Sequence, residues 1–146
     1  MISVEKLFEN KDHDVWCAKP DDSVFDAVKL MDSKDIGALA VIQDGALVGV
    51  VSERDCAREV ILKNCASDEI KVKDIMTRQV YYTFPEQDVD ECMGVMTRHH
   101  IRHLPVMKSD KMIGMISIGD VVKTLLAEQQ IKIEQLEHYI TWEESY

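Results

Sequence analysis

The sequence predicts a mixed α/β fold in which one β-α-β-β-α unit occurs twice, with the two copies packed sheet to sheet and followed by a long C-terminal helix. Three observations support this prediction: an internal repeat, apolar residues at helical spacing in both copies, and paired apolar runs separated by turn residues. The chain has 146 residues and is 46% hydrophobic. That is enough for one compact domain or for two half-domains that share a core.

The repeat is found by comparing the chain with itself at an offset of 65 residues. Between residues 15–62 and 80–127, 10 of 48 aligned pairs are identical, whereas ordinary residue usage gives about three. The motif "GVVSERD" at 49–55 is matched by "GMISIGD" at 114–120. Such self-similarity indicates a tandem duplication. We place repeat 1 at residues 7–62, a linker at 63–74, repeat 2 at 75–127 and a helical extension at 128–146.

Each unit has the same predicted elements. Apolar residues recur at i, i+3, i+4 and i+7 in residues 24–31 and again in 89–96, which predicts one buried helix face in each copy, with Ser23 as an N-cap. Two apolar runs then flank a turn, "QDG" in the first copy and "KSDK" in the second, which predicts a hairpin. Pro105 in the second copy indicates an edge strand. Ser52 and Ser117 open the last helix of each unit.

Composition and charge argue against several classes of protein. The net charge is −10, from 27 acidic and 17 basic residues, which disfavours binding to nucleic acid or to an anionic membrane. No apolar stretch approaches the length of a bilayer span, and the N-terminus "MISVEKLFEN" lacks the features of a secretory signal. The four cysteines form no C-x-x-C pair. We therefore expect a soluble cytoplasmic protein with reduced thiols.

The repeated Ser-x-x-Asp allows two interpretations. A serine at the N-cap with an acidic residue three positions later is a capping box, which serves the helix alone. However, both copies have Asp where the box prefers Glu or Gln, and both lie where a strand passes into a helix N-terminus, a place that favours anions such as phosphate. A hydroxyl for phosphate and a carboxylate for ribose hydroxyls would suit a nucleotide. The sequence leaves both interpretations open.

With these motifs in place, the chain resembles a tandem pair of cystathionine-β-synthase (CBS) domains, often called a Bateman module. The resemblance rests on "GVVSERD", "GMISIGD", "IRHLPV" and the repeated β-α-β-β-α unit, and it covers about residues 7–127. It implies two sheets stacked about a pseudo-twofold axis with two clefts between the repeats. It also implies adenosine-containing ligands (AMP, ADP, ATP, NAD or S-adenosylmethionine), a regulatory role and no catalytic apparatus.

The resemblance further implies that each cleft combines residues of both repeats. In the first cleft, Asp55 would hold ribose hydroxyls, and Ser52, Arg102 and His103 would meet phosphate. Arg102 suits phosphate because its planar guanidinium donates two charge-assisted hydrogen bonds. The other residues expected to line this cleft are Met76, Thr77, Tyr81 and Ile101.

The second expected cleft pairs Ser117 and Asp120 with Ile36, Gly37 and Ala38. Gly37 and Ala38 stand at the positions that match Arg102 and His103, so this cleft lacks their positive charge. We therefore expect the two clefts to differ, with the one containing Arg102 binding phosphate-rich ligands better.

Other residues suggest further functions only weakly. Three histidines in "RHHIRH" could hold a metal, but the segment crosses from a helix end into a strand, so surface or phosphate-facing roles are favoured and no metal site is predicted. Neither a nucleophile with a partnered base nor a phosphate-binding loop supports an enzyme, and the cysteines are expected to be structural.

The tail from Leu126 to Ile140 has a broken pattern of apolar residues, interrupted by Gln129 and Gln130. Either this helix folds back on its own domain or it contacts a partner and strengthens a homodimer, and we favour the second.

The sequence thus predicts a regulatory module without a catalytic cofactor, binding AMP, ADP, ATP or NAD and acting on an unidentified protein or through its homodimer. The alternative is a structural or interaction dimer whose clefts bind nothing.

Overall fold

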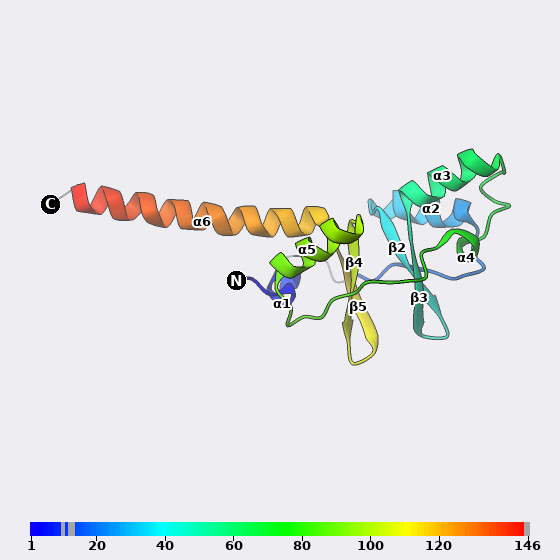
Figure 1. Cartoon of the computed structure of the whole chain (residues 1–146), viewed down its shortest axis with the longest axis horizontal. Helices are drawn as coiled ribbons and strands as arrows, with labels where there is room; N and C mark the ends of the chain where they lie inside the picture. The colour runs from blue at the N-terminus through cyan, green and yellow to red at the C-terminus, as the bar shows by residue number, and fades with distance from the viewer. Residues whose placement is uncertain (10, 12–13, 145–146) are drawn as a thin grey trace. The chain divides into compact units, whose positions relative to one another are not determined.

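The structure, a computed structural model, describes the backbone of residues 1–9, 11 and 14–144 and the side chains of these residues up to 140 (Figure 1). Its described residues form a mixed α/β protein with two small sheets, as the sequence predicts. The elements are α1 (Val4–Glu9), β1 (Cys17–Ala18), α2 (Val24–Lys34), β2 (Ala38–Gln43), β3 (Ala46–Ser52), α3 (Glu53–Lys63), α4 (Val72–Ile75), α5 (Val89–His99), β4 (His103–Lys108), β5 (Lys111–Ser117) and α6 (Ile118–Glu144).

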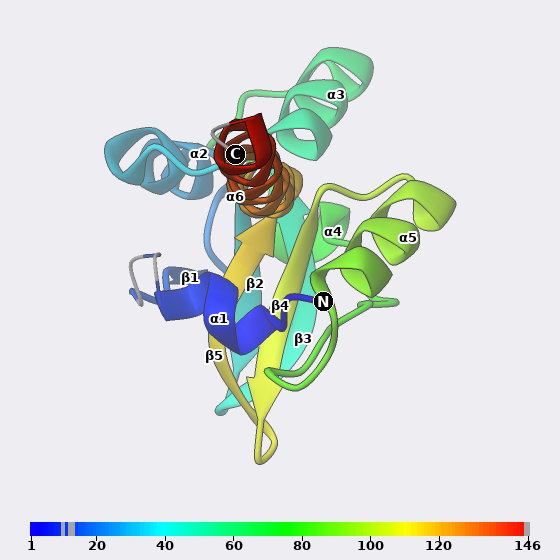
Figure 2. The same cartoon turned by 90° about the vertical axis from the view of Figure 1, so that its left-hand side faces the viewer.

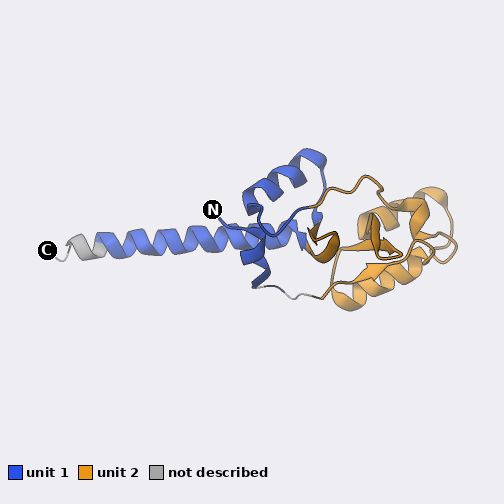
Figure 3. Ribbon diagram, turned by 90° about the horizontal axis from the view of Figure 1, so that it is seen from below, with its two compact units in different colours: residues 1–12, 83–104, 116–146 blue, residues 13–82, 105–115 orange. Residues whose placement is uncertain are grey.

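The chain divides into two compact units, coloured separately in Figure 3. Unit 1 comprises residues 1–12, 83–104 and 116–146, and unit 2 comprises residues 13–82 and 105–115. Each predicted repeat, the linker and the extension is one continuous stretch of sequence. Each compact unit, in contrast, is assembled from two or three separate stretches. Those boundaries, and the predicted packing of sheet on sheet, stay predictions.

In unit 2, the predicted hairpin of repeat 1 is confirmed. β2 and β3 pair antiparallel, and β1 pairs parallel with β2 in the order β1-β2-β3. The turn residues Asp44 and Gly45 both have positive φ, 51° and 82°, as the tightest hairpin turns require. This conformation is why the sequence has Asp-Gly between the two apolar runs.

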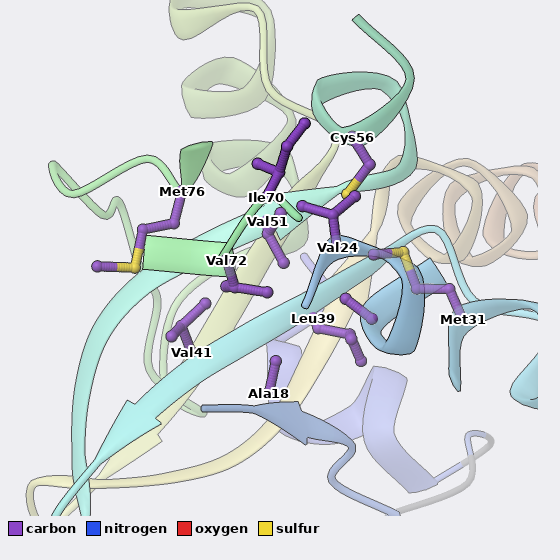
Figure 4. Close-up of a cluster of buried hydrophobic side chains, with 11 residues drawn as sticks. Ala18, Val24, Met31, Leu39, Val41, Val51, Cys56, Ile70, Val72 and Met76 are labelled. Carbon is purple, nitrogen blue, oxygen red and sulfur yellow. The ribbon is translucent and has the colours of Figure 1, made fainter. Parts of the chain in front are cut away.

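The core of unit 2 lies between this sheet and the helices α2, α3 and α4 (Figure 4). Met31 of α2, Leu39 and Val41 of β2, Val51 of β3 and Val72 of α4 are each fully buried. Burying a side chain of this kind contributes roughly 1.5–3 kcal/mol, so the apolar periodicity of the sequence accounts for the packing of this unit.

Helix α2 begins and ends as its sequence predicts. The Ser23 hydroxyl accepts a hydrogen bond from the Asp26 N–H at 3.0 Å, which confirms Ser23 as N-cap. At the other end, Asp35 adopts the left-handed conformation with φ 53°, and its N–H donates to the carbonyls of Asp32 and Met31. These two caps fix the helix over the apolar face that it buries.

In unit 1, α1 and α5 both contact α6. The N-terminal segment is hydrogen-bonded to the start of α5: Val4 N–H donates to the Gln87 carbonyl, and Val89 N–H donates to the Ile2 carbonyl, each at 2.8 Å. Helix α1 was not predicted from the sequence. Its residues Val4, Leu7 and Phe8 are buried, so α1 belongs to the core of unit 1.

The duplication is visible in equivalent hydrogen bonds of the two repeats. Ile36 N–H donates to the Met31 carbonyl, and Ile101 N–H donates to the Met96 carbonyl, both at 3.0 Å. One predicted element differs, because the first strand of repeat 2 is absent from the described residues. Thr83, the counterpart of Ala18, is only a bridge residue. Its hydroxyl donates to the Gln87 side chain at 2.7 Å.

Helix α6 runs without interruption over 27 residues (Figure 1), which at 1.5 Å per residue is about 40 Å long. Figure 2 looks along its axis from the C-terminal end. The prediction that repeat 2 continues into a helical tail is confirmed. The alternative in which the tail folds back on its own domain is wrong for the described residues, because the helix does not turn and Leu126, Ile133, Leu136 and Ile140 are exposed. None of the described helices combines the length and apolarity needed to cross a membrane.

Candidate functional site

The first Ser-x-x-Asp lies in unit 2 at the junction of β3 and α3. The Ser52 hydroxyl accepts from the Asp55 N–H at 3.2 Å, which caps the helix. Ala38 pairs with Ser52 across β2 and β3, and the Glu53 N–H donates to the Gly37 carbonyl at 3.0 Å. The structure therefore brings Ser52 together with Gly37 and Ala38 of its own repeat. These two residues are the counterparts of Arg102 and His103 in repeat 2.

The Asp55 side chain is half-buried. Among the residues that the structure describes, its carboxylate takes part in no hydrogen bond or ion pair. It does not reach back to the Ser52 N–H, so the reciprocal half of a capping box is missing here. A carboxylate at a helix N-terminus with both oxygens unengaged is able to accept two hydroxyl donors from a ligand.

Met76 and Thr77 lie against β3 in the same unit. Thr77 and Val50 exchange two backbone hydrogen bonds, at 2.9 and 3.0 Å. Gly49 allows this approach, because a Cβ there would lie 2.6 Å from Met76 Sδ and 3.0 Å from the Thr77 carbonyl oxygen. Tyr81, also in unit 2, accepts a hydrogen bond at 3.5 Å from Gln79. The repeated glycine thus holds the 76–77 segment beside the strand that ends in Ser52.

The second Ser-x-x-Asp lies in unit 1 at the junction of β5 and α6, and it is a complete capping box. The Asp120 N–H donates to the Ser117 hydroxyl at 3.1 Å, and the Ser117 N–H donates to Asp120 Oδ2 at 2.8 Å. The Ile118 N–H donates to the Arg102 carbonyl at 2.8 Å, which is the counterpart of the Glu53–Gly37 bond. Both hydrogen bonds of a capping box are therefore present at Ser117 and Asp120. At Ser52 and Asp55 only the bond from the Asp55 N–H to the serine hydroxyl is present among the described residues.

Asp120 also forms an ion pair with Lys11 in the same unit. Burial acts to raise the pKa of this carboxyl, but hydrogen bonds from Lys11 and from the Ser117 backbone, with the charge of Lys11, outweigh it and lower the pKa. Lys11 stands in no sequence motif, and only the fold brings it to Asp120, so no sequence pattern could predict it. Lys11 thus adds a cation beside Asp120 that the comparison of Gly37 and Ala38 with Arg102 and His103 did not include, and the expected difference between the two clefts stays a prediction.

His103 lies in the electric field of the same group. Burial lowers its pKa, the positive charges of Lys11 and Arg102 lower it further, and Asp120 opposes them. His103 is half-buried and Arg102 is exposed. At neutral pH this imidazole is therefore uncharged and able to accept or donate one hydrogen bond.

The predicted site residues fall into the two units separately, and the mixed clefts between repeats stay a prediction. Within unit 2 the structure places the first Ser-x-x-Asp near Gly37 and Ala38 of its own repeat and holds Met76 and Thr77, from the predicted range of repeat 2, against the strand that ends in Ser52. Unit 2 holds Ile36, Gly37, Ala38, Ser52, Asp55, Met76, Thr77 and Tyr81, and unit 1 holds Ile101, Arg102, His103, Ser117 and Asp120.

The histidines and cysteines show no reactive arrangement among the described residues. His99 ends α5, His100 is its left-handed C-cap and His103 begins β4, so the helical i, i+4 pairing of His99 and His103 does not occur. Groups of His, Cys, Asp and Glu suited to a metal are not found in the described part of the chain. Burial raises the pKa of the Cys56 thiol to about 11, which favours the unreactive form.

Comparison with known proteins establishes the family. The model of the CBS domain family matches residues 10–62 and 72–127, so the chain belongs to the CBS-domain proteins, and the resemblance noted from its motifs is confirmed. It is 43% identical over 131 residues to the mitochondrial CBS domain-containing protein CBSX3 of Arabidopsis thaliana, covering 86% of this chain and 63% of that protein. The chain thus spans slightly under two thirds of that relative.

Solved structures agree with this assignment. A protein with CBS domains from Burkholderia ambifaria is 44% identical, with a TM-score of 0.84 over 88% of this chain and 96% of that one. A more distant CBS domain pair, solved in complex with 5′-methylthioadenosine and S-adenosyl-L-methionine, is 21% identical with a TM-score of 0.77 over 87% of this chain and 98% of that one. The second likeness concerns the fold alone.

Proposed function

We propose that this CBS pair is a regulatory module that binds an adenosine-containing ligand, and that it signals to an unidentified protein or through its own homodimer. One observation carries the proposal: the Asp55 carboxylate stands at a helix N-terminus without a hydrogen bond or ion pair among the described residues. A carboxylate so placed fits a pair of ribose hydroxyls, and the helix N-terminus favours phosphate. The distant neighbour in complex with two adenosine compounds supports this choice of ligand.

The proposed ligands are AMP, ADP, ATP and NAD, with S-adenosylmethionine included because of that neighbour. The role we propose is regulatory and not catalytic, so no catalytic cofactor is part of it. The cysteines support this, because burial raises the pKa of Cys56, Cys92 and Cys17 and so works against thiolate formation. A cytoplasmic location is likewise proposed from composition.

The two Ser-x-x-Asp motifs are proposed to bind with different affinity. Asp120 already has Lys11 and the Ser117 N–H as partners, so a ligand there has to replace an ion pair that Asp55 does not have. We therefore expect the first ligand to bind at Asp55. In the Lys11→Gln variant Asp120 loses this competitor, and a second ligand should bind more tightly than to the native chain.

Thermal unfolding with each nucleotide tests the proposal. A ligand at one hundred times its dissociation constant stabilises the folded state by about 2.7 kcal/mol, which raises the midpoint by several degrees for a chain of this size. The Asp55→Asn variant should lose this shift. Asp90→Asn is the matched control, because Asp90 also lies in the first turn of a helix but outside the motif, and it should keep the shift.

The second candidate function is an interaction module whose Ser-x-x-Asp motifs only cap helices. The complete capping box and ion pair at Asp120 favour it for repeat 2. If no ligand moves the midpoint of the native chain, the adenosine proposal is wrong and this second candidate replaces it.

A further inference from the structure

The outer part of α6 carries apolar side chains with nothing over them among the described residues. Between Val122 and Ile140, the large apolar side chains recorded as exposed keep 40–63% of their surface accessible. A lone helix exposed on all sides is of marginal stability in water, since most helical stability in proteins comes from packing an apolar face. We therefore expect this part of α6 to be stabilised by packing against another protein surface.

Five of the seven exposed apolar residues, all except Ile131 and Tyr139, follow a strict heptad spacing. Starting at Val122, steps of four and three residues lead in turn to Leu126, Gln129, Ile133, Leu136 and Ile140. Five of these six positions are apolar, which defines the narrow seam of a two-stranded coiled coil, with 126, 133 and 140 at a positions and 122, 129 and 136 at d positions. We call these six residues the α6 seam.

We propose that the α6 seam pairs in parallel with the same seam of a second copy of this chain. Isoleucine at the a positions 133 and 140 with leucine at the d position 136 favours two parallel strands. Gln129 is the single polar residue in the seam, and the two Gln129 amides face each other only when the helices are in register. Polar residues at a positions fix register at some loss of stability, and we expect Gln129 at its d position to act in the same way, because an amide buried against apolar side chains costs free energy unless it is hydrogen-bonded.

The charges beside the seam fit a parallel pair. Lys132 lies at a g position and Glu137 at the e position five residues later, so in a parallel dimer each Lys132 faces Glu137 of the other copy. An antiparallel pair sets g against g and e against e, which places like charges together. Within its own helix Lys132 contacts Glu128 at 3.8 Å, but Lys132 is more than half exposed, and such pairs contribute little.

This inference rests on the homodimer in the proposed function and names the surface that forms it, while it does not depend on ligand binding. The decisive comparison is between two isoleucines that lie two residues apart. Ile133 is in the seam and 46% exposed, whereas Ile131 is 56% exposed and lies on the outer, f position. Ile133→Glu and Ile131→Glu are therefore a matched pair.

Sedimentation equilibrium of the full chain measures the effect. We expect a dimer for the native chain and for Ile131→Glu, and for Ile133→Glu a dissociation constant at least tenfold higher. Circular dichroism spectra of both variants check that the fold is retained. A dimer of Ile133→Glu as tight as the native one would overturn the α6 seam and leave the homodimer standing, whereas a monomeric native chain would overturn both.

Charge reversal tests the orientation without removing apolar surface. Lys132→Glu alone and Glu137→Lys alone should each weaken the dimer, and the double variant should restore it. Restoration is expected only for parallel helices, so a double variant weaker than either single one overturns the parallel arrangement. Nucleotide-induced shifts of the unfolding midpoint, measured on Ile133→Glu, report on the adenosine proposal separately.

Discussion

At the scale of single residues, the two copies of one motif have diverged in what their carboxylates contact. Asp120 accepts from the Ser117 N–H and pairs with Lys11, whereas Asp55 has neither bond among the described residues. The backbone around both aspartates is equivalent. The Glu53 N–H donates to the Gly37 carbonyl, and the Ile118 N–H donates to the carbonyl of Arg102, the residue that matches Gly37 in the other repeat. The difference therefore comes from side chains, and chiefly from a lysine outside both motifs.

His103 gives the first prediction at this scale. Its pKa in the folded chain lies below the usual 6.5 because of burial and the nearby Lys11 and Arg102. Above pH 6.5 the imidazole is neutral in both folded and unfolded states; as the pH falls below that value, the unfolded state takes up a proton that the folded state resists. The free energy of unfolding should therefore decrease from about pH 7.5 to about pH 5.5.

The measurement is urea unfolding across this pH range. In His103→Gln the decrease should be smaller, because the titrating group is gone. His138→Gln, on the exposed part of α6, should keep the native slope. Equal slopes for His103→Gln and the native chain would contradict the assignment.

Sequence reasoning identified Ser52, Asp55, Ser117 and Asp120 because local spacing alone marks a strand-to-helix junction with a cap. It could not find Lys11, which meets Asp120 across 109 positions of sequence. Nor could it tell that one carboxylate is engaged and the other is not, since both copies read Ser-x-x-Asp. A contact between residues far apart in the sequence, such as Lys11 and Asp120, leaves no periodic pattern in the sequence.

At the scale of elements, the sequence predicted helices and hairpins wherever a period or a turn residue marked them. The helix at 24–34, the Asp44-Gly45 turn and the long C-terminal helix follow such signals. Two elements did not. Helix α1 has six residues, too few for a clear period. The first strand of repeat 2 is reduced to a bridge at Thr83 among the described residues, because strand pairing there is decided by tertiary contacts and not by local spacing.

The glycine that opens the repeated motif gives the prediction at this scale. Gly49→Ala would place a Cβ 3.0 Å from the Thr77 carbonyl oxygen, a backbone atom, and within 3.0 Å of two atoms of Met76. Overpacking of this kind costs about 1–3 kcal/mol. Gly94→Ala is the matched control in α5, where a Cβ meets nothing within 4 Å, and alanine there should stabilise the helix by roughly 0.5–1 kcal/mol.

Urea unfolding of the two variants should therefore give changes of opposite sign. A Gly49→Ala chain as stable as the native one would mean that the 76–77 segment moves away from β3 at no cost. In that case the close contact of Gly49 with Met76 and Thr77 would not explain why glycine stands at this position.

At the scale of the whole molecule, the sequence repeats and the compact units divide the chain differently. The strands β4 and β5 of repeat 2 are each shared, because residues 105–115 of the hairpin belong to unit 2 and its remaining residues belong to unit 1. The chain therefore passes from one unit to the other within both strands. The chain has 146 residues and its backbone crosses between the units within both strands of one hairpin, so we expect one cooperative unfolding transition, as for most single domains under about 150 residues.

Two buried cysteines measure that cooperativity, one in each unit. Cys56 in unit 2 and Cys92 in unit 1 are at most 2% exposed, and burial raises the pKa of both thiols. Under native conditions a thiol reagent should modify the exposed Cys65 first. Cys56 and Cys92 should then react at low rates that correspond to the same free energy of opening.

Mass spectrometry of the labelled chain at increasing urea distinguishes the outcomes. If the whole chain unfolds together, the protection of Cys56 and Cys92 falls in parallel and reaches zero at one urea concentration. The Met31→Ala substitution, which removes a fully buried side chain from the core of unit 2, should cost about 2–5 kcal/mol and lower the protection of both thiols equally. Loss of protection at Cys56 with Cys92 unchanged would show instead that unit 1 stays folded when unit 2 opens, and that the shared hairpin does not couple them.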